Sequence, residues 1–200
     1  MTSEGDAWSA YYDQTAGLGA HETLRAAMRL FDRERAAPGF AVDLGCGDGR
    51  DTAELIKSGW QVLAIDREPA SIERLRARLG PVEAGRLNAV QARFEQVAWP
   101  PALLVNASLS LPFCDPRLFP LLWRKIVDSI VPGGRFAGHF LGQNDAWAGH
   151  CAITVLKRSE LDGMLSGLQV ELMEELERDM PLALGQMKHW HLFQVVARKK

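Results

Sequence analysis

Short apolar runs alternate with helical patterns along most of the chain, and this alternation limits the fold more than any other feature. Residues 39–44 form the first run, and closely spaced glycines follow it, as expected of a buried strand that ends in a tight turn. Residues 51–57 then carry apolar side chains at helical spacing, and a second apolar run begins at residue 60. Strands joined by crossover helices lie parallel, so the chain is expected to fold as an α/β sandwich.

The alternation continues to residue 165 and then changes. We expect helices over 51–57, 71–79, 118–130 and 159–165, and strands over 39–44, 60–65, 89–91, 101–106 and 135–141. Two further strands, 169–174 and 190–198, follow one another with little helix between them. The pattern predicts a doubly wound, mostly parallel, seven-stranded sheet of the Rossmann-like kind, with helices on both faces and an antiparallel edge strand. Residues 1–200 are expected to form a single domain.

Composition argues against several classes of protein. The net charge is −2, from 23 basic and 25 acidic residues, so the composition does not indicate the excess of positive charge that is typical of nucleic-acid-binding proteins. Cys46, Cys114 and Cys151 lack the paired spacing of a disulfide framework and suit a reducing compartment. Neither a signal-peptide pattern nor an apolar stretch of about 18 residues is present. We expect a cytoplasmic monomer or homodimer with no nucleic-acid or membrane partner.

The segment 43–50 reads Asp-Leu-Gly-Cys-Gly-Asp-Gly-Arg and is the most informative part of the chain. Glycines at alternate positions let the backbone turn sharply and approach a ligand closely. The helix that follows directs its N-terminus to the same place, at the carboxyl end of a strand, where open α/β sheets bind their ligands. A dinucleotide fingerprint requires its third glycine at position 50, where this chain has Arg50, and this counts against NAD.

An acid followed by alternating glycines resembles the first motif of the class I S-adenosylmethionine-dependent methyltransferases. Further segments resemble the other motifs of that family in the same order, namely 62–66, 91–94, 104–108 and 131–136. The resemblance runs from about residue 37 to 141 of the printed sequence. Within the family, 47–52 is similar to small-molecule branches such as the tellurite-resistance and thiopurine methyltransferases.

The resemblance implies S-adenosylmethionine as cofactor and in-line transfer of its methyl group to a small-molecule acceptor. A carboxylate at the end of the second strand, Asp66, then accepts hydrogen bonds from both ribose hydroxyls. Residues 1–36 are expected to form a helical N-terminal lid or cap over the cofactor. The implied cofactor-binding residues are Tyr11, Asp43, Gly45, Cys46, Gly47, Gly49, Asp66, Arg67, Ala92, Arg93, Phe94, Asn106 and Ala107.

No general base stands out, and three residues are candidates for a catalytic role. His139 lies near the end of the fifth expected strand, His191 lies on the last one, and Tyr12 belongs to the N-terminal segment. No acidic or cysteine partner has ligand-like spacing near His191, so no metal site is expected. The polar and aromatic residues of 144–147, together with 150–151, are candidates for lining the acceptor pocket. The lack of an evident base favours an acceptor that is already nucleophilic.

Other functions remain open at this point. A non-catalytic S-adenosylmethionine-binding protein would share the same glycine loop, and a protein or RNA methyltransferase would share the same domain. An NAD-dependent reductase is the least favoured alternative, because the third glycine falls at position 49.

Overall fold

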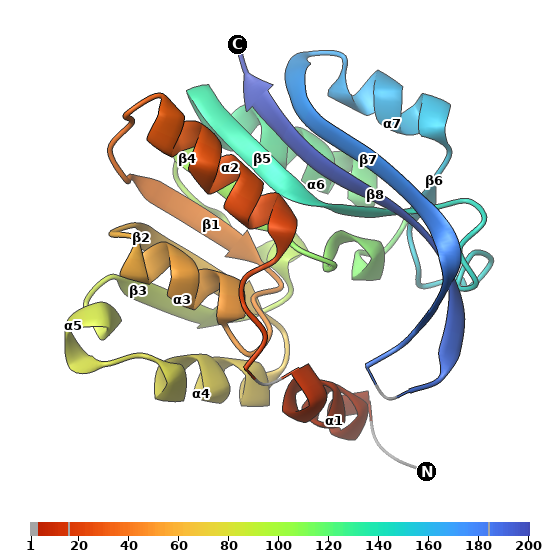
Figure 1. The fold of residues 1–200 in the computed structure, drawn as a ribbon, viewed down its shortest axis with the longest axis horizontal. Coiled ribbons are helices and arrows are strands. Elements are labelled where there is room, and N and C mark those ends of the chain that lie inside the picture. The colour runs from red at the N-terminus through yellow and green to blue at the C-terminus, as the bar shows by residue number, and fades with distance from the viewer. Residues whose placement is uncertain (1–3, 16, 184) are drawn as a thin grey trace.

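The computed structural model describes residues 4–15, 17–183 and 185–200, and within them the strands form one eight-stranded sheet (Figure 1). Seven strands follow the order β3-β2-β1-β4-β5-β8-β7, and β6 pairs with β5 beside this path. The strands are β1 (Phe40–Leu44), β2 (Gln61–Asp66), β3 (Leu87–Gln91), β4 (Ala102–Ala107), β5 (Ile130–Gly142), β6 (Val155–Leu156), β7 (Leu168–Pro181) and β8 (Met187–Lys199).

Helices cover both faces of the sheet, as Figure 1 shows. They are α1 (Glu4–Thr15), α2 (Glu22–Arg33), α3 (Arg50–Lys57), α4 (Pro69–Arg78), α5 (Pro81–Ala84), α6 (Phe119–Ser129) and α7 (Arg158–Leu165). On one face α2, α3 and α4 bury Leu24, Leu55 and Leu75 against the sheet. On the other face α6 and α7 bury Ile126 and Leu161 in a second core.

The central strands are apolar on both sides because both faces are covered. In β1, Ala41 belongs to the core under α2–α4, whereas Val42 and Leu44 belong to the core under α6 and α7. The two cores therefore alternate along a single strand, which is the arrangement of a buried parallel sheet. The expected doubly wound, mostly parallel sheet is confirmed.

The C-terminal hairpin departs from the expectation in length and position. Strand β7 continues to Pro181 and β8 starts at Met187, so both strands extend well beyond 169–174 and 190–198. The extension is rich in charged residues, and its strand conformation comes from the β7–β8 pairing rather than from an apolar pattern. Strand β8 runs antiparallel to both β5 and β7, so the antiparallel strand lies one place inside the edge.

The N-terminal segment divides into two helices with different surroundings. Helix α2 packs on the sheet, with Leu24 and Ala27 fully buried, and is part of the layer that covers it. Helix α1 instead borders the pocket described below. Of the segment 1–36 that was expected to form a cap, α1 borders the pocket and α2 covers the sheet, while residues 1–3 and 16 lie outside the described part of the chain. No described helix combines the length and the apolar character needed to cross a membrane.

Candidate active site

A pocket opens at the carboxyl ends of β1, β2 and β4 and encloses about 870 Å³ of empty space, its open mouth included. The lining comes from α1, the residue before α2, the glycine loop with the start of α3, the ends of β1 and β2, and the segments after β2, β3 and β4. It comprises Tyr11, Tyr12, Thr15, His21, Asp43, Gly45, Cys46, Gly47, Asp48, Arg50, Asp51, Asp66, Arg67, Glu68, Arg93, Phe94, Glu95, Ser108, Leu109, Ser110 and Phe113.

The glycine loop is tied to the end of β2 by backbone and carboxylate hydrogen bonds. The N–H groups of Gly45 and Cys46 both donate to the carbonyl oxygen of Ile65, at 2.8 and 3.0 Å. The N–H of Gly47 donates to Oδ2 of Asp66 at 2.8 Å, and the N–H of Glu68 donates to Oδ1 at 2.9 Å. Burial raises the pKa of Asp66 although these bonds act in the opposite direction. Asp66 therefore both shapes the loop and lines the pocket.

Gly45 is one of the positions in this loop where a side chain would be costly. Its φ is +71°, and a Cβ there would lie 2.4 Å from Cβ of Ser110. Gly59 has a φ of +92° but an ordinary nearest contact of 3.4 Å, so it serves as a matched control. We expect Gly59→Ala to lower the free energy of unfolding by about 1–2 kcal/mol through backbone strain alone. Gly45→Ala should cost about 1 kcal/mol or more beyond this and also weaken ligand binding, as urea denaturation and calorimetry would reveal. Equal losses in the two variants would contradict the close contact with Ser110.

Two buried carboxylates lie beneath the loop and share one amide. Asn106 Nδ2 donates to Oδ1 of Asp43 at 2.9 Å and to Oδ2 of Asp51 at 3.0 Å. Thr52 Oγ1 donates to the other oxygen of Asp43 at 2.5 Å. Burial, and then the charge of Asp51, raise the pKa of Asp43. Burial acts on Asp51 in the same direction, but hydrogen bonds and charge from His21 outweigh it and hold the pKa of Asp51 below its ordinary range.

The raised pKa of Asp43 predicts that the stability of the protein depends on pH. Folded Asp43 holds its proton more tightly than the unfolded chain does, so its contribution is present at low pH and is lost as pH rises through the folded pKa. Between about pH 5 and pH 8, wild type should therefore lose more unfolding free energy than Asp43→Asn, which has no proton to release there. Urea denaturation at both pH values measures the difference. An equal or larger loss in the variant would show that Asp43 is not the group responsible.

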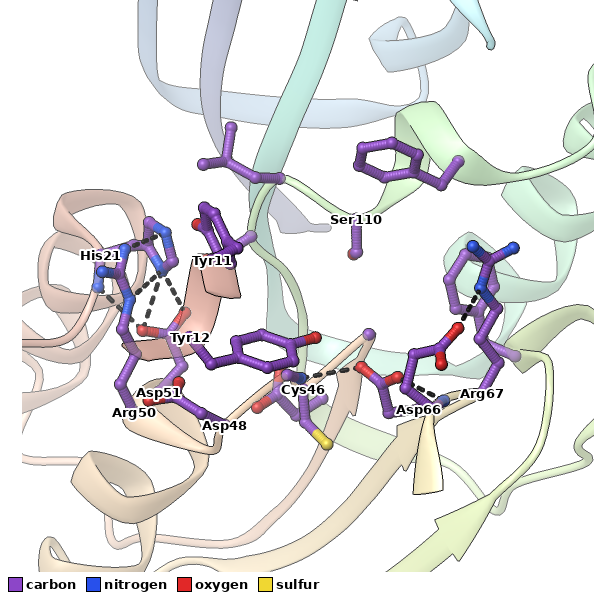
Figure 2. A pocket seen from close by; sticks show the side chains of 18 of the residues that line it. Tyr11, Tyr12, His21, Cys46, Asp48, Arg50, Asp51, Asp66, Arg67 and Ser110 are labelled. Carbon is purple, nitrogen blue, oxygen red and sulfur yellow. Dashed lines mark hydrogen bonds and ion pairs between the residues drawn. The ribbon is translucent and has the colours of Figure 1, made fainter. Parts of the chain in front are cut away.

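His21 is a pocket residue that the sequence analysis missed. It precedes α2, and its backbone N–H donates to Oδ1 of Asp51 at 2.8 Å. Its Nδ1 lies 3.1 Å from both carboxylate oxygens of Asp51, and the guanidinium of Arg50 contacts both ring nitrogens of the imidazole (Figure 2). Arg50 and Asp51 are adjacent at the start of α3, so the N-terminal ends of α2 and α3 meet here.

Both tyrosines of the chain, Tyr11 and Tyr12, come from α1 and line the pocket. Tyr12 is buried, its hydroxyl accepts a hydrogen bond from Ser71 at 3.0 Å, and its ring lies 3.0 Å from the position of a Cβ on Gly47. Burial, with Asp66 nearby, raises the pKa of Tyr12 well above its ordinary value, so the hydroxyl keeps its proton at neutral pH. Burial also raises the pKa of Tyr11. Helix α1 thus closes one wall over the glycine loop.

Ten of the residues expected in the site from sequence line the pocket, and six do not. Those in the lining are Tyr11, Tyr12, Asp43, Gly45, Cys46, Gly47, Asp66, Arg67, Arg93 and Phe94. Gly49 caps α3, and the N–H of Ala92 donates to the carbonyl of Asp66. Asn106 and Ala107 are fully buried behind the loop, where Asn106 supports the two carboxylates. His139 and His191 are the remaining two.

The two histidines proposed as bases lie away from the pocket lining. His139 is buried on β5, where burial lowers its pKa to about 3, and its Nδ1 accepts the N–H of Leu109 at 3.3 Å. Leu109 does line the pocket and has a φ of +54°, so His139 supports a strained loop residue. His191 lies on β8, where its Nε2 is 2.9 Å from Glu175 on β7. His191 therefore contributes to the hairpin.

The loop after β5 also serves structure more than the pocket. Asp145 is buried and forms an ion pair with Lys188 at 2.5 Å, and the ammonium of Lys188 lies over the rings of Trp147 and Trp190.

No group of three or more metal-ligating side chains is found within the described ranges 4–15, 17–183 and 185–200. His150 and Cys151 line a second cleft, which shares Arg67, Arg93 and Phe113 with the pocket.

Comparisons with known proteins match part of the chain to a family model and to one curated relative. A family model described as a methyltransferase domain matches residues 41–134. A carboxy-S-adenosyl-L-methionine synthase from Enterobacter sp. (strain 638) is 30% identical over 103 residues. That match covers 48% of this chain and 42% of the relative, so it spans less than half of the relative's length.

Solved structures share the fold over nearly the whole chain. TehB from Haemophilus influenzae has a TM-score of 0.73 and 17% identity, covering 96% of this chain and 67% of that one. A Burkholderia thailandensis 1,6-didemethyltoxoflavin-N1-methyltransferase has a TM-score of 0.67 and 20% identity, covering 98% and 86%. Magnesium protoporphyrin IX methyltransferase from Synechocystis PCC 6803 has a TM-score of 0.67 and 12% identity, covering 97% and 91%. Residues 41–134 therefore match a methyltransferase domain, and the chain shares its fold with solved methyltransferase structures.

Proposed function

We propose that this protein transfers a methyl group from S-adenosylmethionine to a small-molecule acceptor. The observation that carries the proposal is the place of Asp66, which lies in the pocket and is bonded to the glycine loop through Gly47. The solved structures of similar fold include one with bound S-adenosylmethionine and one with bound S-adenosylhomocysteine and a small-molecule ligand. Cytoplasmic location, a monomeric or homodimeric state and the absence of a nucleic-acid partner stay predictions from sequence.

The pocket residues fit this cofactor in chemistry. The Asp66 carboxylate can accept hydrogen bonds from ribose hydroxyls. The aromatic ring of Phe94 and the neighbouring Arg93 can contact the adenine. The absence of a Cβ at Gly45 leaves room for the loop to approach Ser110 and the bound molecule. Carboxylates outnumber arginines in the lining, and this balance suits a positively charged sulfonium.

The bound cofactor supplies an activated methyl group whose leaving group is a neutral thioether. The protein's task is then alignment, because in-line displacement gains most from holding nucleophile and methyl carbon in one geometry. Asp66 and the glycine loop fix the adenosine end, while Tyr11 and Leu109 narrow the space in which an acceptor approaches. Tyr12, whose hydroxyl stays protonated, keeps water from the loop beneath it and takes no proton.

Titration calorimetry with S-adenosylmethionine and, separately, NAD tests the proposal. We expect S-adenosylmethionine and S-adenosylhomocysteine to bind and NAD not to bind, because position 50 lacks the third glycine of the dinucleotide loop. A screen with a labelled methyl group and small nucleophilic acceptors then tests turnover. Binding without turnover on any acceptor would favour the non-catalytic alternative, and binding of NAD alone would overturn the proposal.

A further inference from the structure

A second cleft adjoins the pocket and shares Arg67, Arg93 and Phe113 with it. Figure 2 shows Arg67 beside Asp66, on the side of the pocket opposite His21, so the cleft meets the pocket at that end. The remaining walls come from 115–118, which leads into α6, and from 150–153, which precedes β6. The glycine loop, described at every residue from 43 to 50, contributes nothing to this lining. The cleft is therefore a space of its own.

Hydrogen bonds join the two outer walls of the cleft. The N–H of Thr154 donates to the carbonyl oxygen of Pro112 at 2.8 Å, and its Oγ1 donates to the carbonyl oxygen of Cys114 at 2.9 Å. All three residues are buried. The segments 115–118 and 150–153 therefore start from one fixed junction, and the cleft between them is formed before any ligand binds.

The cleft and the pocket differ in the sign of their charge. Three arginines and one acid, Asp115, are among the described residues that line the cleft, whereas six acids and three arginines line the pocket. Arg67 pairs with Glu68 at 3.2 Å, and Arg93 pairs with Glu95 at 2.9 Å. Both glutamates line the pocket but not the cleft. The cleft therefore attracts anions, whereas the pocket attracts cations.

Arg93 and Arg117 are the arginines best placed to hold an anion in the cleft. The ion pair of Arg93 runs through one terminal nitrogen, Nη2, whereas a guanidinium carries five N–H donors. Asp115 holds Arg117 in place, because its Oδ1 accepts the backbone N–H of Arg117 at 2.9 Å and the side-chain Nε at 3.0 Å. The side chain of Arg117 is still 88% exposed, so a ligand can reach it. A carboxylate in the cleft can accept charge-assisted hydrogen bonds from these guanidinium groups while both ion pairs stay intact.

The cleft also has an apolar surface. Phe113, Pro116, Leu118 and Ile153 contribute apolar side chains to it, and Leu118 is one of the large hydrophobic residues that the fold leaves exposed. The ring of Phe113 packs against that of Trp147, with centroids 6.0 Å apart, so its position is supported from behind. Covering this surface favours a ligand with an apolar body, and a flat ring can lie against Phe113.

From the charge and the apolar walls together we propose that this cleft binds a small anionic ligand with an apolar body, beside the cofactor and distinct from it. The cleft does not depend on the proposed function; only the statement that its neighbour is the adenosine end of the cofactor does. The same chemistry has two sources, a separate small molecule or an anionic part of the methyl acceptor. Competition between ligands separates them.

The probes are naphthalene-2-carboxylate and its neutral counterpart naphthalene-2-carboxamide, titrated by calorimetry into protein saturated with S-adenosylhomocysteine. We expect the carboxylate to bind and the amide to bind about 10-fold or more weakly, because it lacks the charge-assisted hydrogen bonds. Arg117→Gln should weaken the carboxylate about threefold to fivefold, as expected for an exposed charge, and leave S-adenosylhomocysteine unchanged. Adding Arg93→Gln should bring the loss to about 10-fold or more, with less than about a twofold change for the amide.

Two further variants control for general effects of substitution. Arg124→Gln removes an exposed arginine of α6 that lies outside both linings, and it should change the affinity for neither probe. Ala152→Trp places a large side chain at an exposed position of the cleft wall, and it should abolish binding of both probes. Thermal denaturation checks that each variant is folded.

Cys151 reports independently on where the probe binds. It is exposed and lines the cleft, whereas Cys46 and Cys114 are buried, so the neutral reagent iodoacetamide should alkylate Cys151 first. Bound naphthalene-2-carboxylate should slow this alkylation in wild type, and the same concentration should slow it less in the double arginine variant. Mass spectrometry of the digested protein measures the rate at each cysteine.

Several results would overturn the site: no binding of the carboxylate, equal affinity for the two probes, no protection of Cys151, or displacement of the carboxylate by S-adenosylhomocysteine. If the site holds, an acceptor from the labelled-methyl screen identifies the source. An acceptor that displaces the probe is itself the ligand, and one that binds alongside the probe makes the ligand a separate molecule. If wild type does not bind S-adenosylhomocysteine, the proposed function fails instead, and the probes titrated into the free protein decide the cleft alone.

Discussion

Replacing Asp66 with alanine is expected to weaken S-adenosylmethionine binding by one to two orders of magnitude while the protein stays folded. A hydrogen bond to a charged group contributes about 1.5–3 kcal/mol, and the carboxylate has lone pairs left for the ribose after accepting the N–H groups of Gly47 and Glu68. The substitution would remove the proposed ribose contact and the hydrogen bond from Gly47 to β2, while Gly45 and Cys46 remain bonded to Ile65. Titration calorimetry measures the loss, and thermal denaturation checks the fold.

Two further variants distinguish the effect of the Asp66 charge on affinity from a general effect of removing an acid. Asp66→Asn keeps one carbonyl acceptor but loses the charge, so its affinity should fall between those of wild type and Asp66→Ala. Asp162→Ala removes an exposed acid of α7 that is paired with Arg158, far along the chain from every pocket residue, and should leave the affinity unchanged. A folded Asp66→Ala protein that binds the cofactor as wild type does would remove Asp66 from the site.

The glycine loop and its surroundings could be predicted because the signals are local. A buried strand, alternating glycines and the helix after them lie within 39–57, so short-range patterns alone place Asp43, Gly45 and Gly47 together. Asp66 follows the same logic one strand later, because the carboxyl ends of neighbouring parallel strands meet at one edge. These residues all line the pocket.

His21 could not be predicted in the same way, because its role depends on a contact across 30 positions of sequence. The N-terminal ends of α2 and α3 meet only after both helices have packed on the same face of the sheet. Arg50 and Asp51 were visible at the start of their helix, but their partner was not. The one available signal was a histidine directly before a strongly amphipathic segment, which is also common where no ligand binds.

The placement of Asn106, Ala107, His139 and His191 shows a second limit. Strand residues alternate between the two faces, and a one-residue difference in register decides whether a side chain faces the pocket or a core. Asn106 points under the loop to Asp43 and Asp51, and His139 lies buried beside His21 with ring centroids 5.6 Å apart. Sequence patterns located the strand ends correctly but could not fix these directions. The long β7–β8 hairpin was underestimated for a related reason, because its outer half is charged.

Replacing Arg135 with alanine is expected to cause the largest loss of stability, about 3–5 kcal/mol of unfolding free energy. The Arg135 side chain is 0% exposed, lies 4.4 Å from the ring of Phe31, and donates to Glu34 of the α2 C-terminus and Glu171 of β7. It therefore joins α2, β5 and β7 through one buried charge. Its removal leaves a cavity and leaves the carboxylate of Glu171, which is only 11% exposed, without its ion-pair partner.

Arg198→Ala is the matched control for this prediction. Arg198 binds the same Glu34 carboxylate at 3.2 Å, but its side chain is 37% exposed, and an exposed pair of this kind contributes about 0–1 kcal/mol. Urea denaturation of both variants therefore compares the contributions to the free energy of unfolding of a buried and an exposed arginine that share the partner Glu34. The expected losses differ by more than about 2 kcal/mol, because water can replace the partner of the partly exposed Glu34 in one case, whereas Glu171 is only 11% exposed and loses its partner in the other. Similar losses in the two variants would mean that the buried guanidinium contributes no more than a surface charge.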